Sequence, residues 1–283
     1  MVFKPKANEE LREAVDIWCS DKEKALERYG EINTWNTSNI TSMKNLFNNK
    51  INFNDNISNW DTSKVINMEA MFNGCNKFNQ PLNKWKISEV TAMSCMFWGC
   101  VKFNQPLNNW NTSNVTSMNY MFYNCVKFNQ PLNNWNTSKV KYMNDMFNNC
   151  VNFNQPLNNW NTSKVTNMER MFYECKSFNQ PLNNWDISKV ANMEYMFFDC
   201  KSFNQSLNNW DTSNVYYMDY MFYGCKEFNQ DLANWNLKSL KECNKMFHGC
   251  CSYSYPLFSW TNYNTIMNTQ IFNRAIINKS SKV

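Results

Sequence analysis

Apolar residues recur along this chain with a fixed period of 25 residues. Tryptophan marks the period most clearly, at Trp35, Trp60, Trp85, Trp110, Trp135, Trp160, Trp185, Trp210, Trp235 and Trp260. Methionine, Met-Phe, cysteine, phenylalanine and leucine columns recur at constant offsets from the tryptophans. A period in this range is typical of repeat proteins, in which each unit buries its apolar face against its neighbours. The pattern therefore predicts a solenoid in which each column becomes an apolar stripe.

Each period is expected to contain short helical turns on one flank and a short strand on the other. From Val115, apolar residues follow at steps of three or four to Met118, Met121 and Cys125, which indicates α-helical or 3₁₀ turns. The stretch Phe-Asn-Gln-Pro-Leu-Asn-Asn-Trp that follows indicates an extended flank, because its recurrent proline disfavours a helix. We expect strands of about two to four residues and hence an α/β repeat solenoid.

The N-terminal segment does not follow the period. Apolar residues with the spacing of one helix face occur at Leu11, Ala14, Val15, Trp18 and Cys19. Ser20 and Glu23 form a capping-box signature for a second short helix that ends near Gly30. We expect the two helices to cover the open apolar end of the first coil, and a helical module with its own binding role is the alternative.

Three segments follow from these patterns. They are a helical N-terminal cap over residues 1–30, a repeat solenoid of about ten coils over 31–260, and a degenerate C-terminal coil and tail over 261–283. The last coils depart from the consensus, with Cys243 in the methionine column and Tyr253 in the phenylalanine column. Atypical terminal repeats of this kind are typical of a capping coil.

Asparagine and cysteine also occupy fixed columns. The Asn column that includes Asn79, Asn104 and Asn129 predicts a ladder in which each amide bonds the backbone and the asparagine of the next coil. Twelve cysteines would fit a disulfide scaffold, yet eight of them share one column between apolar residues. The start of the sequence shows no apolar signal region, so reduced core thiols are favoured over disulfides between neighbouring coils.

A family resemblance is carried by the block Trp-Asp-Thr-Ser-Asn-Val-Tyr-Tyr-Met-Asp-Tyr-Met-Phe-Tyr-Gly-Cys at 210–225 and the Phe-Asn-Gln that follows it. The block resembles the 25-residue variant of the BspA-like leucine-rich-repeat family, a domain of unknown function common in mycoplasma lipoproteins, algae and large DNA viruses. The resemblance extends over nearly the whole chain. It implies a right-handed, leucine-rich-repeat-like stack and a surface or interaction role. With the asparagine-rich composition it favours a viral or protist product, either cytoplasmic or virion-associated.

The sequence predicts no enzyme, no metal site and no cofactor. The single histidine, His248, stands in a variable column, and a cysteine nucleophile needs a base such as histidine beside it. A linear column of cysteines does not converge as zinc ligands must. Glu69, Glu169, Glu194 and Asp219 share one column on different coils and indicate a solvated acidic edge.

Sequence differences between the repeats indicate where a partner would bind. Two variable columns, the second residue after Met and the residue after Met-Phe, are three residues apart and are rich in aromatic residues. The candidate partner-binding residues in these columns are Trp98, Tyr120, Tyr123, Tyr173, Tyr195, Phe198, Tyr220 and Tyr223. Aromatic residues exposed in a row are typical of interface hot spots, but they can also stack on each other as a purely structural ladder.

Charge and hydropathy narrow the possible partners. Lysine columns, such as the one with Lys77, Lys102 and Lys127, could in principle hold single-stranded nucleic acid beside the aromatic residues. The formal net charge of +5 is low for phosphate binding, so these lysines are expected to solubilise the edges. The chain has no apolar run long enough to span a membrane. We therefore predict a non-enzymatic protein-interaction scaffold; the alternative is a structural component, such as a virion or surface protein that acts as a rigid spacer or self-associates.

Overall fold

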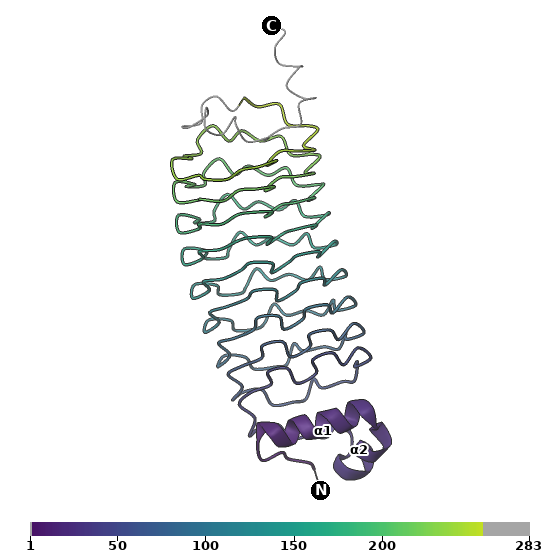
Figure 1. Ribbon diagram of the computed structural model, residues 1–283. Coiled ribbons are helices and arrows are strands. Elements are labelled where there is room, and N and C mark those ends of the chain that lie inside the picture. The colour runs from purple at the N-terminus through teal and green to yellow at the C-terminus, as the bar shows by residue number, and fades with distance from the viewer. Residues whose placement is uncertain (1, 257–283) are drawn as a thin grey trace.

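The computed structural model describes residues 2–256, and in it the chain winds into successive coils stacked along one axis (Figure 1). The coils are held in register by isolated parallel bridges between residues 25 positions apart, from Ser42–Asn67 to Tyr217–Glu242. Each of these bridges pairs a single residue directly before the methionine column of the coil, whereas strands of about two to four residues were expected on the Phe-Asn-Gln-Pro-Leu flank. The predicted place of the strands was therefore wrong, and the expected flank is irregular within the described residues. The tenth tryptophan, Trp260, and the degenerate coil expected over 261–283 lie outside the described residues.

Two helices lie beneath the first coil (Figure 1). Helix α1 spans Asn8–Ser20 and helix α2 spans Lys22–Tyr29, followed by a 3₁₀ turn, η1, over Ile32–Thr34. The buried face of α1 includes Trp18, whose ring lies 5.8 Å from that of Trp35, the first tryptophan of the repeat. The helices therefore cover the apolar end of the stack.

The cap between the two helices differs from the predicted capping box. The Asp21 side chain accepts the hydrogen bond from the Lys24 amide at 3.1 Å and so caps α2. The Ser20 hydroxyl instead donates to the carbonyl of Asp16 at 2.7 Å. The prediction of Ser20 as the cap was wrong by one residue, because both residue types are good N-caps and Ser20 is still the last residue of α1.

A double turn, defined as the segment from the first Met to the Cys of each coil (118–125 in one coil), takes the place of the expected helical turns. Within this coil, amides bond to carbonyls three residues back in the pairs Met121–Met118, Tyr123–Tyr120 and Cys125–Phe122, at 2.9–3.2 Å. Four other amides bond to carbonyls of the next coil in the pairs Met118–Tyr142, Tyr120–Asn144, Phe122–Met146 and Asn124–Asn148, at 2.7–3.1 Å. Positive φ angles at Tyr120 and Asn124, 56° and 58°, rule out a helix, because a right-handed helix has negative φ throughout.

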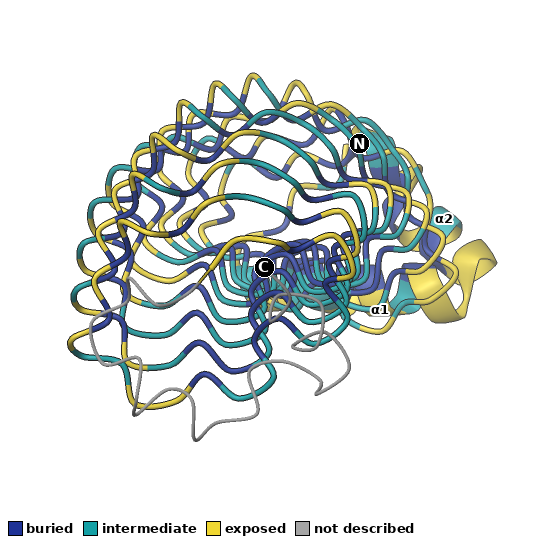
Figure 2. Cartoon of the chain, turned by 90° about the horizontal axis from the view of Figure 1, so that it is seen from above, coloured by how far each residue is buried: buried dark blue, intermediate teal, exposed yellow. Residues whose placement is uncertain are grey.

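The core consists of side chains stacked on their own kind. Phe122 lies parallel to Phe97 and Phe147 of the adjacent coils, with ring centroids 5.6 Å apart. Trp135 and Trp160 stack at 6.3 Å. Viewed along the stack, the buried positions of successive coils line up (Figure 2). Among residues 2–256, no helix has the length and apolar composition that crossing a lipid bilayer requires.

Polar atoms in this interior are satisfied by bonds that repeat with the coils. The indole N–H of Trp135 donates to the carbonyl of Leu107 at 2.9 Å, and the thiol of Cys125 donates to the carbonyl of Phe97 at 3.0 Å. Burial raises the pKa of the Cys125 thiol well above its usual value, so it stays protonated. These bonds recur in coil after coil, and buried polar groups without partners would destabilise the fold.

The predicted asparagine ladder is confirmed, with one difference in its bonding. The side-chain oxygen of Asn104 accepts from the backbone amide of Asn129 at 2.9 Å and from the side chain of Gln130 at 3.1 Å. The partner in the next coil is therefore a backbone amide together with a glutamine, and not another asparagine side chain. The column is structural, because each oxygen is used within the stack.

Candidate functional site

The eight candidate aromatic residues lie in two rows on the outer side of the double turns. The first row contains Tyr120, Tyr195 and Tyr220, which occupy the third position of the double turn. The second row, three residues further along each coil, contains Trp98, Tyr123, Tyr173, Phe198 and Tyr223. All eight side chains are partly exposed, which sets them apart from the fully buried Met and Phe side chains of the same turns. We call the two rows together the aromatic strip.

First-row residues have an unusual backbone conformation. Tyr120, Tyr195 and Tyr220 have φ angles of 56–57°, in the left-handed region. The first coil has asparagine at the equivalent position, Asn45 with a φ of 57°, and asparagine tolerates this region better than most residues. Ala70, Arg170 and Lys245 adopt φ angles of 51–52° at the same position, so this conformation belongs to the double turn and does not depend on the residue type.

The second row is a stack of rings in two separate runs. Trp98 and Tyr123 stack with centroids 4.4 Å apart. The other run starts at Tyr173, which stacks on Phe198 at 4.6 Å, and Phe198 stacks on Tyr223 at 4.7 Å. His248 continues this run at 4.8 Å from Tyr223, so the single histidine is part of the stack.

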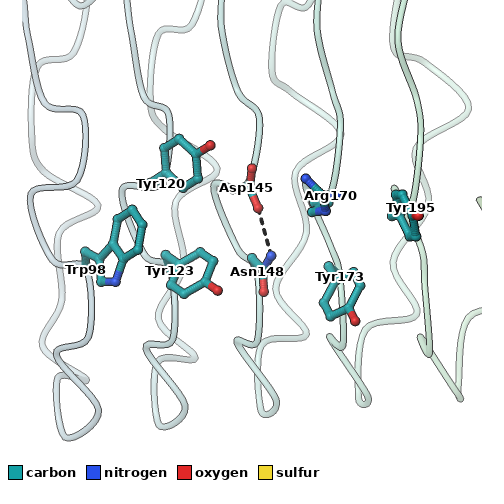
Figure 3. A pocket seen from close by; sticks show the side chains of 8 residues that line it. All are labelled: Trp98, Tyr120, Tyr123, Asp145, Asn148, Arg170, Tyr173 and Tyr195. Carbon is teal, nitrogen blue, oxygen red and sulfur yellow. Dashed lines mark hydrogen bonds between the residues drawn. The ribbon is translucent and has the colours of Figure 1, made fainter. Parts of the chain in front are cut away.

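Asp145 and Asn148 separate the two runs. They occupy the strip positions of one coil, between Tyr120 and Tyr123 on one side and Tyr173 on the other (Figure 3). Both are buried, with 3% and 5% of their surface exposed, because their short side chains end below the level of the neighbouring rings. A surface cleft of about 460 Å³ lies over them. The side chains that line the cleft are Trp98, Tyr120, Tyr123, Asp145, Asn148, Arg170, Tyr173 and Tyr195.

One acidic group, Asp145, lies on the floor of this cleft, and a second, Glu169, lies next to the lining residue Arg170. Asn148 donates its side-chain N–H to the Asp145 carboxylate at 2.8 Å (Figure 3). Burial raises the pKa of Asp145, although the Asn148 hydrogen bond and the Arg170 charge oppose this shift. Burial also raises the pKa of Glu169. The positive charge of Arg170 lowers this pKa, and the negative charge of Asp145 raises it. Two carboxyl groups thus share one guanidinium, and the site favours additional positive charge.

Arg170 is held by residues on its own side of the cleft. Its guanidinium forms an ion pair with Glu169 and lies over the ring of Tyr195, 4.8 Å from the centroid. A cation over a tyrosine face is attracted by the ring quadrupole. Arg170 is therefore already paired, whereas the close side-chain partners of Asp145 are the neutral groups of Asn148, Asn144 and Tyr120.

The sequence identified the aromatic residues of this cleft but not its polar ones. Five predicted residues line the cleft, whereas Phe198, Tyr220 and Tyr223 lie further along the strip. Asp145, Asn148 and Arg170 were missed, although they stand in the same two variable columns. The sequence does contain a signal for them: between coils that carry aromatic residues in these columns, one coil carries two short polar side chains.

Charged side chains elsewhere on the described surface form a second group. The carboxylates of Glu194, Asp219 and Glu242 lie within 4.8 Å of one another; Glu242 is exposed, Glu194 is partly exposed, and Asp219 is buried with 8% of its surface exposed. Glu194 and Asp219 were expected on a solvated acidic edge, and their proximity would allow a cation to be shared. Asp219 already accepts a hydrogen bond from the Asn244 side chain at 3.1 Å, and nothing else at this position points to a ligand. None of the predicted lysine columns lines the aromatic cleft.

Comparison with known proteins places the repeats in one family. The family described as "Mycoplasma protein of unknown function, DUF285" matches residues 19–126, 105–206 and 182–282, three overlapping regions in tandem. No curated protein matches the chain. The tandem matches agree with the repeated sequence columns and cover the aromatic strip completely.

Proposed function

This chain belongs to the DUF285 family, which carries no assigned function, and we propose from the geometry of the strip that it is a non-enzymatic protein-interaction scaffold. The single observation that carries the proposal is the row of partly exposed aromatic side chains around a cleft, on the face where the repeats differ. Large aromatic side chains that are half desolvated in the free protein supply most of the binding energy at many interfaces.

The same stacks also support a structural interpretation. Ring pairs contribute about 0.5–1.5 kcal/mol each beyond burial, so the strip stiffens the stack whether or not a partner binds. The interruption at Asp145 favours the scaffold, because a purely structural ladder gains nothing from a buried carboxylate.

Finer features of the proposal rest on the resemblance of the repeat block. We infer a right-handed, BspA-like leucine-rich-repeat arrangement of the coils and a cytoplasmic or virion-associated protein of viral or protist origin. The second candidate function is a structural component that packs against copies of itself through the strip. Exposed apolar side chains such as Tyr142 and Tyr216 favour this alternative, because they extend the apolar surface beyond the strip.

The test compares two sets of alanine substitutions in the full chain. One variant replaces Tyr123, Tyr173, Phe198 and Tyr223, and the matched control replaces the exposed Tyr142 and Tyr216 outside the strip. Partners captured from candidate host extracts are then purified, and their affinity for each folded protein is measured directly. A partner that binds the wild type and the control but not the strip variant supports the scaffold.

The opposite result has an equally clear meaning. If every captured partner binds the strip variant with unchanged affinity, the scaffold proposal fails. If the wild type instead forms concentration-dependent oligomers in sedimentation and the strip variant does not, the structural alternative replaces it.

A further inference from the structure

In the second row, the cleft takes the place of one ring between Tyr123 and Tyr173. Consecutive rings of the second row stack 4.4–4.7 Å apart where no residue interrupts them. Tyr123 and Tyr173 belong to coils two steps apart, so their rings are separated by roughly 9–10 Å, twice the spacing of adjacent chains. A flat group placed midway would contact both rings at normal stacking distance, above the short Asn148 side chain.

The floor of the cleft specifies the charge of such a group. The Asp145 carboxylate is buried and bonded to a neutral amide, and Glu169 lies on the next coil. A neutral ring would remove solvent from this carboxylate and supply no positive charge beyond that of Arg170, which Asp145 shares with Glu169. A flat cation would stack on the tyrosines and at the same time donate hydrogen bonds to the carboxylate.

The molecule already contains one example of this contact. Arg170 forms an ion pair with Glu169, while its guanidinium stacks over Tyr195 at 4.8 Å. Its guanidinium thus contacts one acidic and one aromatic residue. The cleft contains the same two kinds of residue, with Asp145 as the acid and Tyr123 or Tyr173 as the ring. A guanidinium in the cleft would repeat this arrangement one coil away.

We propose that the cleft between Tyr123 and Tyr173 binds the guanidinium of an arginine side chain on a protein partner, with Asp145 as its acceptor. This inference rests on the proposed scaffold function and names the chemistry of its central contact. Arginine fits better than lysine, because its planar group stacks on aromatic faces and donates in a fixed fork to a carboxylate.

The experiment titrates the full chain with acetyl-Gly-Arg-Gly-amide and follows the tyrosine side-chain NMR signals. Counterpart peptides carry lysine, tryptophan or citrulline, the last of which keeps the shape of arginine without its charge. We expect the arginine peptide to shift the signals of Tyr123 and Tyr173 with a Kd on the order of 1 mM. Citrulline should bind at least about fivefold more weakly, because the charge on the contact is lost.

Three variants assign the binding to this cleft. Asp145→Asn keeps the size of the side chain and an acceptor for Asn148, and it should weaken arginine binding about tenfold or more. The double variant Asp145→Tyr with Asn148→Tyr copies the residues found at Tyr120 and Tyr123, fills the cleft and should abolish binding. Glu174→Gln, an acidic residue on the coil of Tyr173 that does not line the cleft, is the matched control and should bind as the wild type does.

Several results would overturn the arginine assignment. They are equal binding of citrulline, stronger binding of the tryptophan peptide, arginine binding that survives filling of the cleft, and no response to arginine at all. Any of these can occur while a captured partner still depends on the strip, in which case the scaffold stands and only the arginine contact fails. If arginine binding fails and every captured partner also binds the strip variant with unchanged affinity, the scaffold proposal itself fails.

Discussion

The interior of the stack and the aromatic strip are both built from rings in rows, but they differ in continuity. In the buried column from Phe47 to Phe247, the Phe side chains repeat without interruption, and successive ring centroids lie 5.5–5.7 Å apart. The strip is broken where Asp145 and Asn148 replace two rings, and its columns also hold Arg170 and Lys245 among the Trp, Tyr, Phe and His rings. The packing of the stack accounts for the uninterrupted Phe column. It does not account for a surface row of rings that is interrupted by a buried carboxylate.

The two regions also differ in the freedom of their polar groups. Interior thiols and indoles each bond a backbone carbonyl of the stack, as Cys150 does with Phe122 at 2.9 Å. In the strip, the carboxylate of Asp145 is bonded to another side chain and faces a cleft. The interior thiols and indoles are therefore satisfied within the stack, whereas Asp145 borders the cleft at which we propose that a partner binds.

The largest expected effect concerns the buried cysteine column at alkaline pH. Burial raises the pKa of thiols such as Cys100, Cys150 and Cys200 well above the usual value. Above about pH 8.5 the unfolded chain loses thiol protons that the folded chain keeps, so stability is full below this pH and falls as pH rises. Each such cysteine contributes up to about 1.4 kcal/mol of loss per pH unit, and the column has eight.

Urea unfolding between pH 7 and 10.5 measures this loss. Cys150→Ala is the matched variant, because it removes one thiol from the centre of the column. The free energy of unfolding of this variant should fall less steeply with pH than that of the wild type, by about 1.4 kcal/mol per pH unit at most, which is the contribution of one proton. The other titrating groups contribute equally to both proteins and cancel in the comparison. Identical slopes for the two proteins would show that the column remains accessible to hydroxide in the folded state.

The next effect tests the two rows of rings directly. Phe147 is fully buried between Phe122 and Phe172, so Phe147→Ala should lower the free energy of unfolding by about 3–5 kcal/mol. Tyr173→Ala removes a half-exposed ring with one stacking partner in its row and should lower it by only about 1–2 kcal/mol. Thermal unfolding of both variants measures the difference. Equal losses would mean that the strip is as structural as the interior.

Filling the cleft should stabilise the protein rather than harm it. The double variant Asp145→Tyr with Asn148→Tyr removes a buried carboxylate and adds rings between Tyr123 and Tyr173. We expect a gain of about 1–3 kcal/mol in thermal unfolding, from new stacking and from the lost desolvation penalty. A destabilised double variant would indicate that Asp145 and Asn148 are needed for the fold and are not kept for binding.

Sequence patterns predicted the columns of this molecule better than its backbone. The tryptophan period, the asparagine ladder and the two helices could be read from spacing, because burial and repetition act on side chains at fixed positions. The double turn was expected to be helical, since steps of three and four residues also fit turns that alternate handedness. Asp145 was missed because a single polar pair in a variable column gains its meaning only from the rings on either side of it.

The smallest expected effect concerns the left-handed positions at the end of the double turn. Gly74, Gly224 and Gly249 occupy this position with φ angles of 71–80°, whereas Glu174 adopts a φ of 55° there. Glu174→Gly relieves the strain of a left-handed side chain, about 1–2 kcal/mol, but loses about 0.5–1 kcal/mol to the freer unfolded chain. The ion pair of Glu174 with Lys176, at 3.5 Å and partly exposed, contributes little to this balance.

We therefore expect Glu174→Gly to stabilise the protein by about 0.5 kcal/mol in urea unfolding. The reverse change, Gly99→Ala, should destabilise it by about 1 kcal/mol through strain alone, because the added Cβ would meet its nearest neighbour at an ordinary 3.7 Å. If both predictions hold, the left-handed tyrosines of the strip carry the same strain. That strain would then be a measured disadvantage of placing aromatic rings at Tyr120, Tyr195 and Tyr220, which stacking or binding must offset. A neutral result for both variants would show that the left-handed positions carry no measurable strain.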